Sequence, residues 1–401
     1  MSKISNVPQI RFKSFTDTWE QRKLAELFVN SGSGGTPKST NKDFYDGDIP
    51  FLSIADIKGR EIRETAKMIT QKGLESSAAW LVPKGALSLA MYASVGKIGI
   101  LNKSMATSQA FFNMVFDNEA CRDFVYTRLE KAELFNEWES YISTGTQRNL
   151  NAEKVKRFKL CVPESLETAK IANIFSQIDN YITLHQRKYD QVVNFKKAML
   201  EKMFPKNGSR IPEIRLKGYT GAWELRKFGD IGTVAMCKRV FKEETSENGD
   251  VPFYKIGTFG GEPDAYITRE LFEKYKSMYP YPQKGDILIS ASGSIGRTVE
   301  YTGKDEYFQD SNIVWLQHNK NIDNSFLKVL YNVVQWSCEG STIKRLYNDN
   351  FLKTEIVIPN IKEQTQIGEY FENLDNLIAL HQRKLQQLKN IKKALLEKMF
   401  V

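Results

Sequence analysis

Apolar residues follow a seven-residue rhythm in two long stretches of the chain. Residues at alternating spacings of four and three mark a seam along one face of a helix. In the first stretch they are Ile171, Phe175, Ile178, Ile182, His185, Tyr189, Val192, Lys196, Met199 and Met203. In the second they are Ile367, Phe371, Leu374, Ile378, His381, Leu385, Leu388, Lys392, Leu395 and Met399. The pattern predicts two helices of roughly 55 Å each, at 1.5 Å per residue. Helices of that length need a partner, and we expect the two to pack on each other as an antiparallel coiled coil.

The rest of the chain has short apolar runs separated by glycine and proline turn signals. We expect strands in the runs 49–54, 86–91, 111–116, 287–290 and 313–316, and helices over 120–140 and 325–338. The predicted organisation is therefore a mixed α/β module over residues 1–165, a helix over 166–204, a polar linker over 205–217, a second α/β module over 218–361 and a second helix over 362–401.

The chain repeats itself. Trp19-Glu-Gln-Arg-Lys23 returns as Trp223-Glu-Leu-Arg-Lys227, Ser94-Val-Gly-Lys97 returns as Ser294-Ile-Gly-Arg297, and Leu200-Glu-Lys-Met-Phe204 returns as Leu396-Glu-Lys-Met-Phe400. When residues 178–204 are aligned with 374–400, 18 of 27 positions are identical, whereas the globular parts barely align outside the shared landmarks. This contrast is typical of a protein that does one mechanical task twice and reads two different things. Neutral drift of the module cores is the alternative. Two helices packed antiparallel would relate the modules by an approximate two-fold axis, a symmetry that the DNA backbone shares.

The charge of the chain agrees with a polyanionic partner but does not establish one. The 401 residues carry a formal net charge of +9, and the isoelectric point is about 9.1. Lysine and arginine gain affinity for nucleic acid by releasing counterions from phosphates. No run of 18 apolar residues and no signal-peptide core occurs, so we expect a cytoplasmic protein with no membrane contact. The four cysteines lack the spacing of a zinc site or a disulfide framework.

The usual catalytic motifs do not occur. The stretch Gly32-Ser-Gly-Gly-Thr-Pro-Lys-Ser39 resembles a phosphate-binding loop, but Pro37 stands where that motif needs glycine. The chain has no Pro-Pro pair of the kind that adenine methyltransferases carry, and its three histidines form no acid-base set. Two of them, His185 and His381, occupy matching seam positions, where a polar residue more commonly sets helix register than binds metal. We therefore predict no catalytic, cofactor-binding or metal-binding residues.

Taken together, these features resemble those of one family. Each module starts Trp-Glu-x-Arg-Lys, each helix ends Leu-Glu-Lys-Met-Phe, and the Ser-x-Gly-Lys/Arg segments are paired. This combination resembles the specificity subunit of Type I restriction-modification systems. The resemblance implies two target-recognition domains held apart by the coiled coil, with double-stranded DNA as ligand. It also implies two modification subunits that use S-adenosylmethionine to methylate adenine, and restriction subunits that hydrolyse ATP with magnesium. One departure is that Gly34-Gly-Thr-Pro37 has no counterpart in the second module, where Cys237-Lys-Arg-Val240 stands.

Two pairs of loops carry the donors that DNA recognition needs. The first pair contributes Tyr92, Ser94 and Lys97 in one module and Ser292, Ser294 and Arg297 in the other, although an ordinary glycine turn would explain it equally well. The second pair contributes Thr144, Thr146, Gln147, Arg148 and Asn149, and Thr342, Lys344, Arg345 and Tyr347.

The residues expected at the subunit and helix interface are the first six seam residues of each run: Ile171, Phe175, Ile178, Ile182, His185 and Tyr189, and Ile367, Phe371, Leu374, Ile378, His381 and Leu385. Two rival hypotheses stay open at this point. One is a free-standing DNA-binding regulator with two modules, and the other is a hydrolase or transferase with an unrecognised site.

Overall fold

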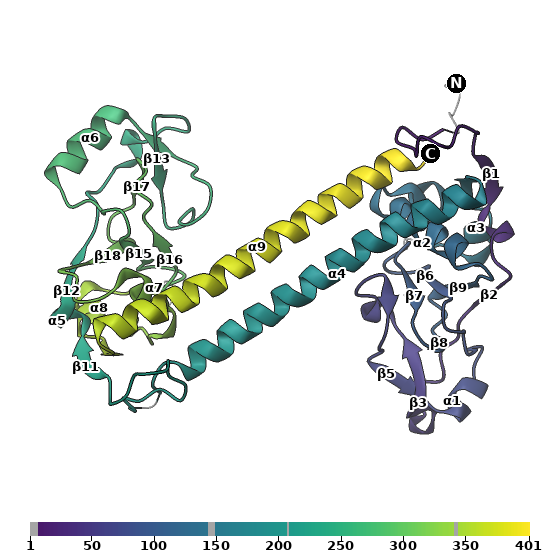
Figure 1. The fold of residues 1–401 in the computed structure, drawn as a ribbon, viewed down its shortest axis with the longest axis horizontal. Coiled ribbons are helices and arrows are strands. Elements are labelled where there is room, and N and C mark those ends of the chain that lie inside the picture. The colour runs from purple at the N-terminus through teal and green to yellow at the C-terminus, as the bar shows by residue number, and fades with distance from the viewer. Residues whose placement is uncertain (1–6, 143–148, 207, 341–343) are drawn as a thin grey trace. The chain divides into compact units, whose positions relative to one another are not determined.

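A computed structural model of the chain describes residues 7–142, 149–206, 208–340 and 344–401. These residues form two compact units. Unit 1 comprises residues up to Lys188 together with His381–Val401, and unit 2 comprises Tyr189–Leu380. Each unit therefore holds the beginning of one long helix and the end of the other. The units are described separately below, and Figure 1 labels their elements.

Unit 1 contains a five-stranded sheet in the order β2-β9-β6-β7-β4. Its strands are β2 (Asn30–Ser33), β9 (Phe111–Val115), β6 (Leu87–Ala90), β7 (Ile98–Leu101) and β4 (Glu61–Ile62). All neighbours are antiparallel except β4 and β7. A three-stranded sheet of β5 (Lys67–Ile69), β3 (Tyr45–Leu52) and β8 (Ala106–Thr107) forms a second lobe with the short helix α1 (Gln71–Glu75). The ribbon of β1 (Glu20–Lys23) and β10 (Lys159–Val162) pairs the start of the module with its end.

The main core of unit 1 lies where the five-stranded sheet meets α2 (Glu119–Leu134) and the long helices. Apolar side chains of β6, β9 and α2 are almost fully buried there. The small helix α3 (Ala152–Lys156) closes the same core through Val155. The runs 49–54, 86–91 and 111–116 were expected as strands, and they form β3, β6 and β9.

Unit 2 repeats this plan with one strand fewer in the larger sheet. A four-stranded sheet has the order β12-β18-β15-β16, from β12 (Gly232–Ala235), β18 (Ile313–His318), β15 (Ile287–Ser290) and β16 (Thr298–Glu300). A second lobe contains β14 (Tyr266–Ile267), β13 (Val251–Tyr254), β17 (Tyr307–Phe308) and helix α6 (Arg269–Met278). The ribbon β11 (Glu224–Lys227) and β19 (Glu355–Ile358) matches β1 and β10. Helices α5 (Phe228–Ile231), α7 (Asn324–Val333) and α8 (Asn348–Lys353) complete the unit.

The helix predicted over 325–338 is shorter in the structure. Helix α7 ends at Val333, and Val334 adopts an extended conformation. The chain leaves the helix because Trp336 stacks on Phe228, with ring centroids 5.6 Å apart, and on Phe351 at 5.2 Å. The helix predicted over 120–140 is likewise divided, into α2 and a 3₁₀ turn over Glu137–Tyr141, at the left-handed residue Asn136.

The two long helices are present as the heptad pattern predicts. Helix α4 spans Ser165–Lys202 and helix α9 spans Ile361–Met399. Every predicted seam residue is buried or half-buried. In unit 1, Phe175 contacts Phe400, and His185 lies opposite His381 with the two Nδ1 atoms 3.0 Å apart. Residue numbers thus fall along one helix as they rise along the other, so the helix segments of this unit are antiparallel, as expected.

The same pairing recurs in unit 2, shifted by the repeat. Phe371 contacts Phe204, as Phe175 contacts Phe400 in unit 1. The repeated Met-Phe that ends each helix therefore has one structural function. Phe400 packs against Trp19 in the core of unit 1, and Phe204 packs against Trp223 in the core of unit 2.

Each module is also tied to the start of its own long helix. In unit 1 the Arg11 guanidinium donates two hydrogen bonds of 2.7 Å to the Glu167 carboxylate, which is fully buried. In unit 2 Arg215 donates two bonds of 2.8 Å to the equally buried Glu363. These paired bonds raise the pKa of both arginines. The repeated pairs Ile10-Arg11 and Ile214-Arg215 therefore each anchor the chain to the start of a long helix. None of the helices in the described ranges is long and apolar enough to cross a membrane.

Candidate nucleic-acid interface

In unit 1 the described end of the second loop, at 149–150, lies beside the first loop. The amide of Leu150, which follows the second loop, donates a 2.9 Å hydrogen bond to the carbonyl of Met91, at the start of the first loop. The amide of Met91 in turn donates a 2.7 Å bond to the carbonyl of Ala110. Three segments, near residues 91–97, 108–110 and 149–150, thus form one surface at the ends of β6 and β9.

Unit 2 builds the same frame with the same backbone bonds. The amide of Leu346 donates to Ala291 at 2.8 Å, and the amide of Ala291 donates to Asn312 at 2.8 Å. A further bond of 3.2 Å joins the amide of Gly293 to the carbonyl of Lys344, and Ser292 pairs with Arg345 in a β-bridge. Two segments that lie about 50 residues apart in the sequence are therefore adjacent in unit 2, and residues 149–150 take the same place in unit 1.

The third loop of this frame was missed by the sequence reasoning. It comprises Ser108 to Ala110 in unit 1 and Asp310 to Asn312 in unit 2, just before β9 and β18. In unit 1 the Thr36 hydroxyl donates to the Gln109 side-chain oxygen. The only signal in the sequence was a short polar stretch directly ahead of an apolar strand, in both repeats, and such stretches are common in turns.

The glycine turns of the first loop are built for a specific backbone shape. Gly96 and Gly296 have φ near +90°, in the left-handed region that favours glycine. A Cβ atom on Gly96 would lie 2.5 Å from Cδ1 of Trp138. One on Gly296 would lie 3.2 Å from Nε1 of Trp336. Each turn therefore packs against a tryptophan, and this contact restricts the position of the turn's backbone.

The basic residues of this loop are engaged within their own module. Lys97 Nζ lies 3.5 Å from the carbonyl oxygen of Ile54, and Arg297 Nη2 donates a 2.6 Å bond to that of Ile256. Both contacts tie the turn to the second lobe. Burial raises the pKa of the neighbouring Glu133 carboxyl, and the charge of Lys97 opposes that rise. A DNA contact from either basic side chain stays a prediction.

The other expected DNA-binding residues differ in how the structure presents them. Ser94, Ser294, Lys344, Arg345 and Tyr347 are exposed, whereas Tyr92 and Asn149 are half-buried and Ser292 is buried. Thr144, Thr146, Gln147, Arg148 and Thr342 lie outside the described residues. Their roles, like those of the exposed residues, stay predictions.

The expected interface residues pack inside this chain. Ile171 and Phe175 belong to the core of unit 1, and Ile367, Phe371 and Leu374 belong to the core of unit 2. The remaining seam residues named above are half-buried along the helices, except Leu385, which is buried. The seam is therefore occupied by the chain's own helices, because the apolar faces of α4 and α9 cover each other within each unit.

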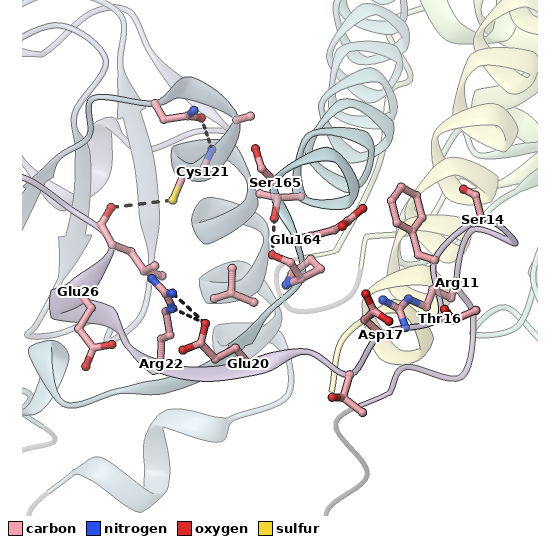
Figure 2. Close-up of a pocket in the computed structure, with 18 of the residues that line it drawn as sticks. Arg11, Ser14, Thr16, Asp17, Glu20, Arg22, Glu26, Cys121, Glu164 and Ser165 are labelled. Atoms are coloured by element: carbon pink, nitrogen blue, oxygen red, sulfur yellow. Dashed lines mark hydrogen bonds and ion pairs between the residues drawn. The ribbon is translucent and has the colours of Figure 1, made fainter.

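A surface cavity of about 640 Å³ in unit 1 has the wrong charge for DNA. Its lining includes five carboxylates, from Asp17, Glu20, Glu26, Asp117 and Glu164. Figure 2 labels four of them, all but Asp117, together with the two arginines of the cavity. Both arginines are already paired, Arg22 with Glu20 and Arg11 with Glu167. Carboxylates repel phosphate, so this cavity is a poor candidate for DNA binding, and the three-loop frame is kept as the candidate interface. Nor does the part of the chain that the structure describes contain three or more His, Cys, Asp or Glu side chains grouped to hold a metal ion.

Comparison with known proteins agrees with the repeated architecture. The family model for the Type I restriction modification DNA specificity domain matches this chain twice, over residues 16–194 and 221–390. The chain belongs to this family. The two matches coincide with the internal repeat, so each copy of the specificity domain consists of one three-loop module and most of the long helix that follows it.

Members of the specificity-domain family resemble the chain over different extents. A Haemophilus influenzae protein named as a putative type I restriction enzyme specificity subunit is 55% identical over 158 residues, which cover 38% of this chain and 41% of that relative. The MjaIX specificity subunit of Methanocaldococcus jannaschii is 24% identical over 408 residues, covering 95% of this chain and 92% of its own length. The solved structure of a Type I restriction-modification S subunit from M. genitalium has a TM-score of 0.65 at 15% identity, over 98% of this chain and 99% of that one. This last likeness shows a shared fold.

Proposed function

We propose that this chain is the DNA sequence-recognition subunit of a Type I restriction-modification complex, and that each module reads one half of a bipartite target. The observation that carries the proposal is the three-loop frame, which is built twice with the same backbone bonds and with different side chains. A fixed frame with variable donors suits a protein that docks twice in the same way and reads two sequences.

The chain itself contributes binding and no chemistry. Double-stranded DNA is its ligand, two modification subunits bring S-adenosylmethionine and methylate adenine, and restriction subunits hydrolyse ATP with magnesium and cut the DNA. The absence of phosphate-loop and methyltransferase motifs from the sequence supports this division of labour.

Exposed apolar side chains on the long helices supply a docking surface for the modification subunits. Three of these positions recur in both repeats, as Tyr181, Leu184 and Ile391 in unit 1 and as Leu377, Leu380 and Phe195 in unit 2. All six are between 43% and 56% exposed. Large apolar residues repeated on a solvent-facing surface are typical of protein interfaces. Because each unit carries the same set, we expect two identical partners.

Deleting the chain from cells that retain the methyltransferase subunit tests the proposal directly. We expect methylation at a split sequence motif to disappear, and purified methyltransferase subunit to co-purify with the chain in a ratio of two to one. Methylation that persists without this chain would contradict the proposal. Tight, sequence-specific binding by the chain alone, with no effect on methylation, would favour an independent regulator instead.

Substitutions on the helices test the docking surface. Replacing Leu184 and Leu380 by glutamate should abolish co-purification of the methyltransferase subunit while both modules stay folded. Thr183→Glu and Ala379→Glu are the matched controls, because these exposed neighbours add the same charges outside the apolar set.

A further inference from the structure

A cavity in unit 2 lies where the three loops meet. Its volume is about 410 Å³, and its lining includes Ala291, Asn312, Arg345 and Tyr347 from the three-loop frame. Three of these four side chains offer hydrogen bonds, and the cavity is large enough for a small ligand group such as the edge of a base. This site goes further than the proposed function, on which it rests, because it assigns a base contact to one residue.

Asn312 is held in place by the frame. The hydroxyl of Ser292 donates a 2.7 Å hydrogen bond to Asn312 Oδ1, and Ser292 is only 5% exposed. The backbone carbonyl of Asn312 accepts the 2.8 Å bond from Ala291 described above. Side-chain ordering before binding lowers the entropy that recognition must overcome. The amide therefore meets DNA in one orientation.

The atoms that Asn312 still has available match one base edge. Oδ1 keeps a second lone pair after accepting from Ser292, and within the described ranges Nδ2 forms no hydrogen bond. An acceptor and a donor side by side complement N6 and N7 of adenine in the major groove. The neighbouring Arg345 is exposed and basic, so it adds attraction for the phosphate backbone.

The internal repeat allows Asn312 to be compared with the residue at the same place in unit 1. Ala110 occupies the place of Asn312 in unit 1, because Met91 donates to its carbonyl as Ala291 does to that of Asn312. Alanine has no polar side-chain atom, and Tyr92 stands where Ser292 would orient one. The backbone is thus the same in both modules, and at this position unit 2 has an oriented amide where unit 1 has the methyl group of Ala110.

We propose that Asn312, positioned by Ser292, reads an adenine in the half-site recognised by unit 2, and that unit 1 makes no equivalent contact. Asn312 forms the base contact, and Ser292 acts as a positioning residue.

The test uses the full chain assembled with its methyltransferase partner. The half-site of unit 2 is first defined as the one that changes when residues 218–361 are exchanged for those of a relative. Methylation sites are then mapped for the wild type, Asn312→Ala and Asn312→Asp. Asn312→Ala should lower the preference for adenine at one position of that half-site by about 10- to 100-fold. Asn312→Asp should shift the preference there toward cytosine, because a carboxylate accepts a hydrogen bond from the N4 amino group of that base.

Controls separate base reading from a structural effect. Ser292→Ala should weaken the same adenine preference less than Asn312→Ala does, and should add nothing in the double variant. Asn332→Ala, an exposed asparagine on α7 outside the cavity lining, should leave the motif unchanged. The half-site of unit 1 should stay intact in every variant.

A modified DNA target tests the same contact with the wild-type protein, so that this test does not depend on the folding of a variant. Replacing each adenine of the half-site in turn by 7-deazaadenine removes N7, and wild-type complex should lose about tenfold or more in affinity at one of them. No loss at any adenine, an unchanged motif for Asn312→Ala, or relaxation at a base other than adenine would overturn the inference. A wild-type chain that directs no methylation would instead overturn the proposed function.

Discussion

Removing Lys392 should destabilise unit 1 far more than removing Lys196, its counterpart in the repeat, destabilises unit 2. Lys392 Nζ lies 2.5 Å from Glu130 Oε1 and 2.5 Å from Asp179 Oδ1. The three side chains are 11%, 24% and 9% exposed. Arg60 adds a 3.2 Å ion pair with Asp179. The lysine therefore holds two carboxylates together away from solvent.

Lys196 makes the equivalent bond in a different setting. Its Nζ lies 2.5 Å from Asp375 Oδ1, but Asp375 is 48% exposed. An exposed ion pair contributes about 0–1 kcal/mol. Breaking a buried pair costs about 3–5 kcal/mol, because the remaining charge is left uncompensated. We therefore expect Lys392→Met to lower the free energy of unfolding by about 2–5 kcal/mol more than Lys196→Met.

Urea unfolding of the full chain, combined with hydrogen exchange to assign each loss to its unit, measures this difference. Equal losses within about 1 kcal/mol would refute the reasoning, because the buried and the exposed ion pair would then contribute equally to stability. Adding Glu130→Gln to Lys392→Met should restore part of the stability, because it removes one of the uncompensated charges.

The pH dependence of the Lys392 variant gives an independent check. Burial raises the pKa of Glu130, against the opposing pull of Lys392. Without the lysine that pKa should rise further above its unfolded value. A carboxyl whose pKa is raised in the folded state binds a proton on folding, so stability increases as the pH falls through that folded pKa. The deficit of Lys392→Met should accordingly shrink as the pH falls toward 4.5, the ordinary pKa of a glutamate carboxyl. A constant deficit would argue against uncompensated charge as its cause.

Two further changes have clear expected outcomes. Gly96→Ala should strain the turn by about 1–3 kcal/mol, since φ is +91° and its Cβ would meet Trp138. Methylation mapping should show a weakened preference in one half-site, whereas Gly59→Ala, which meets nothing within 4 Å, should change nothing. Burial and the charge of His185 lower the pKa of His381. Its folded pKa therefore lies below its unfolded value, so unit 1 should lose stability as the pH falls below about 6.5. His381→Gln should flatten this slope in melting temperatures between pH 7.5 and 5.5, and a slope equal to that of the wild type would exclude His381 as its source.

The family and the helices were predictable because both leave a periodic or repeated pattern in the sequence. The heptad spacing that includes Phe175 and Phe371 follows from helix geometry alone, which places every third or fourth residue on one face. The duplicated Trp-Glu-x-Arg-Lys and Leu-Glu-Lys-Met-Phe segments needed no tertiary information either. Their structural reason is that each one anchors a ribbon or a helix end in a module core.

The heptad pattern did not reveal which of the two seam lysines is buried beside carboxylates. Lys196 and Lys392 occupy equal positions in nearly identical helices, yet only Lys392 is enclosed by two carboxylates. The difference comes from Glu130, which α2 brings to the helix in unit 1. Glu130 lies 262 residues from Lys392 in the sequence, so the local pattern around the lysine does not predict this contact.

What the sequence determined on its own is the repeated plan: two α/β modules, two amphipathic helices and the absence of the usual catalytic motifs. What only the tertiary structure decided is which loops share a surface. Ser292, Asn312 and Arg345 are spread over more than 50 residues and meet through backbone hydrogen bonds between strand ends. Periodicity reports which face of an element is buried, whereas contacts between loops depend on how the strands are ordered in the sheet.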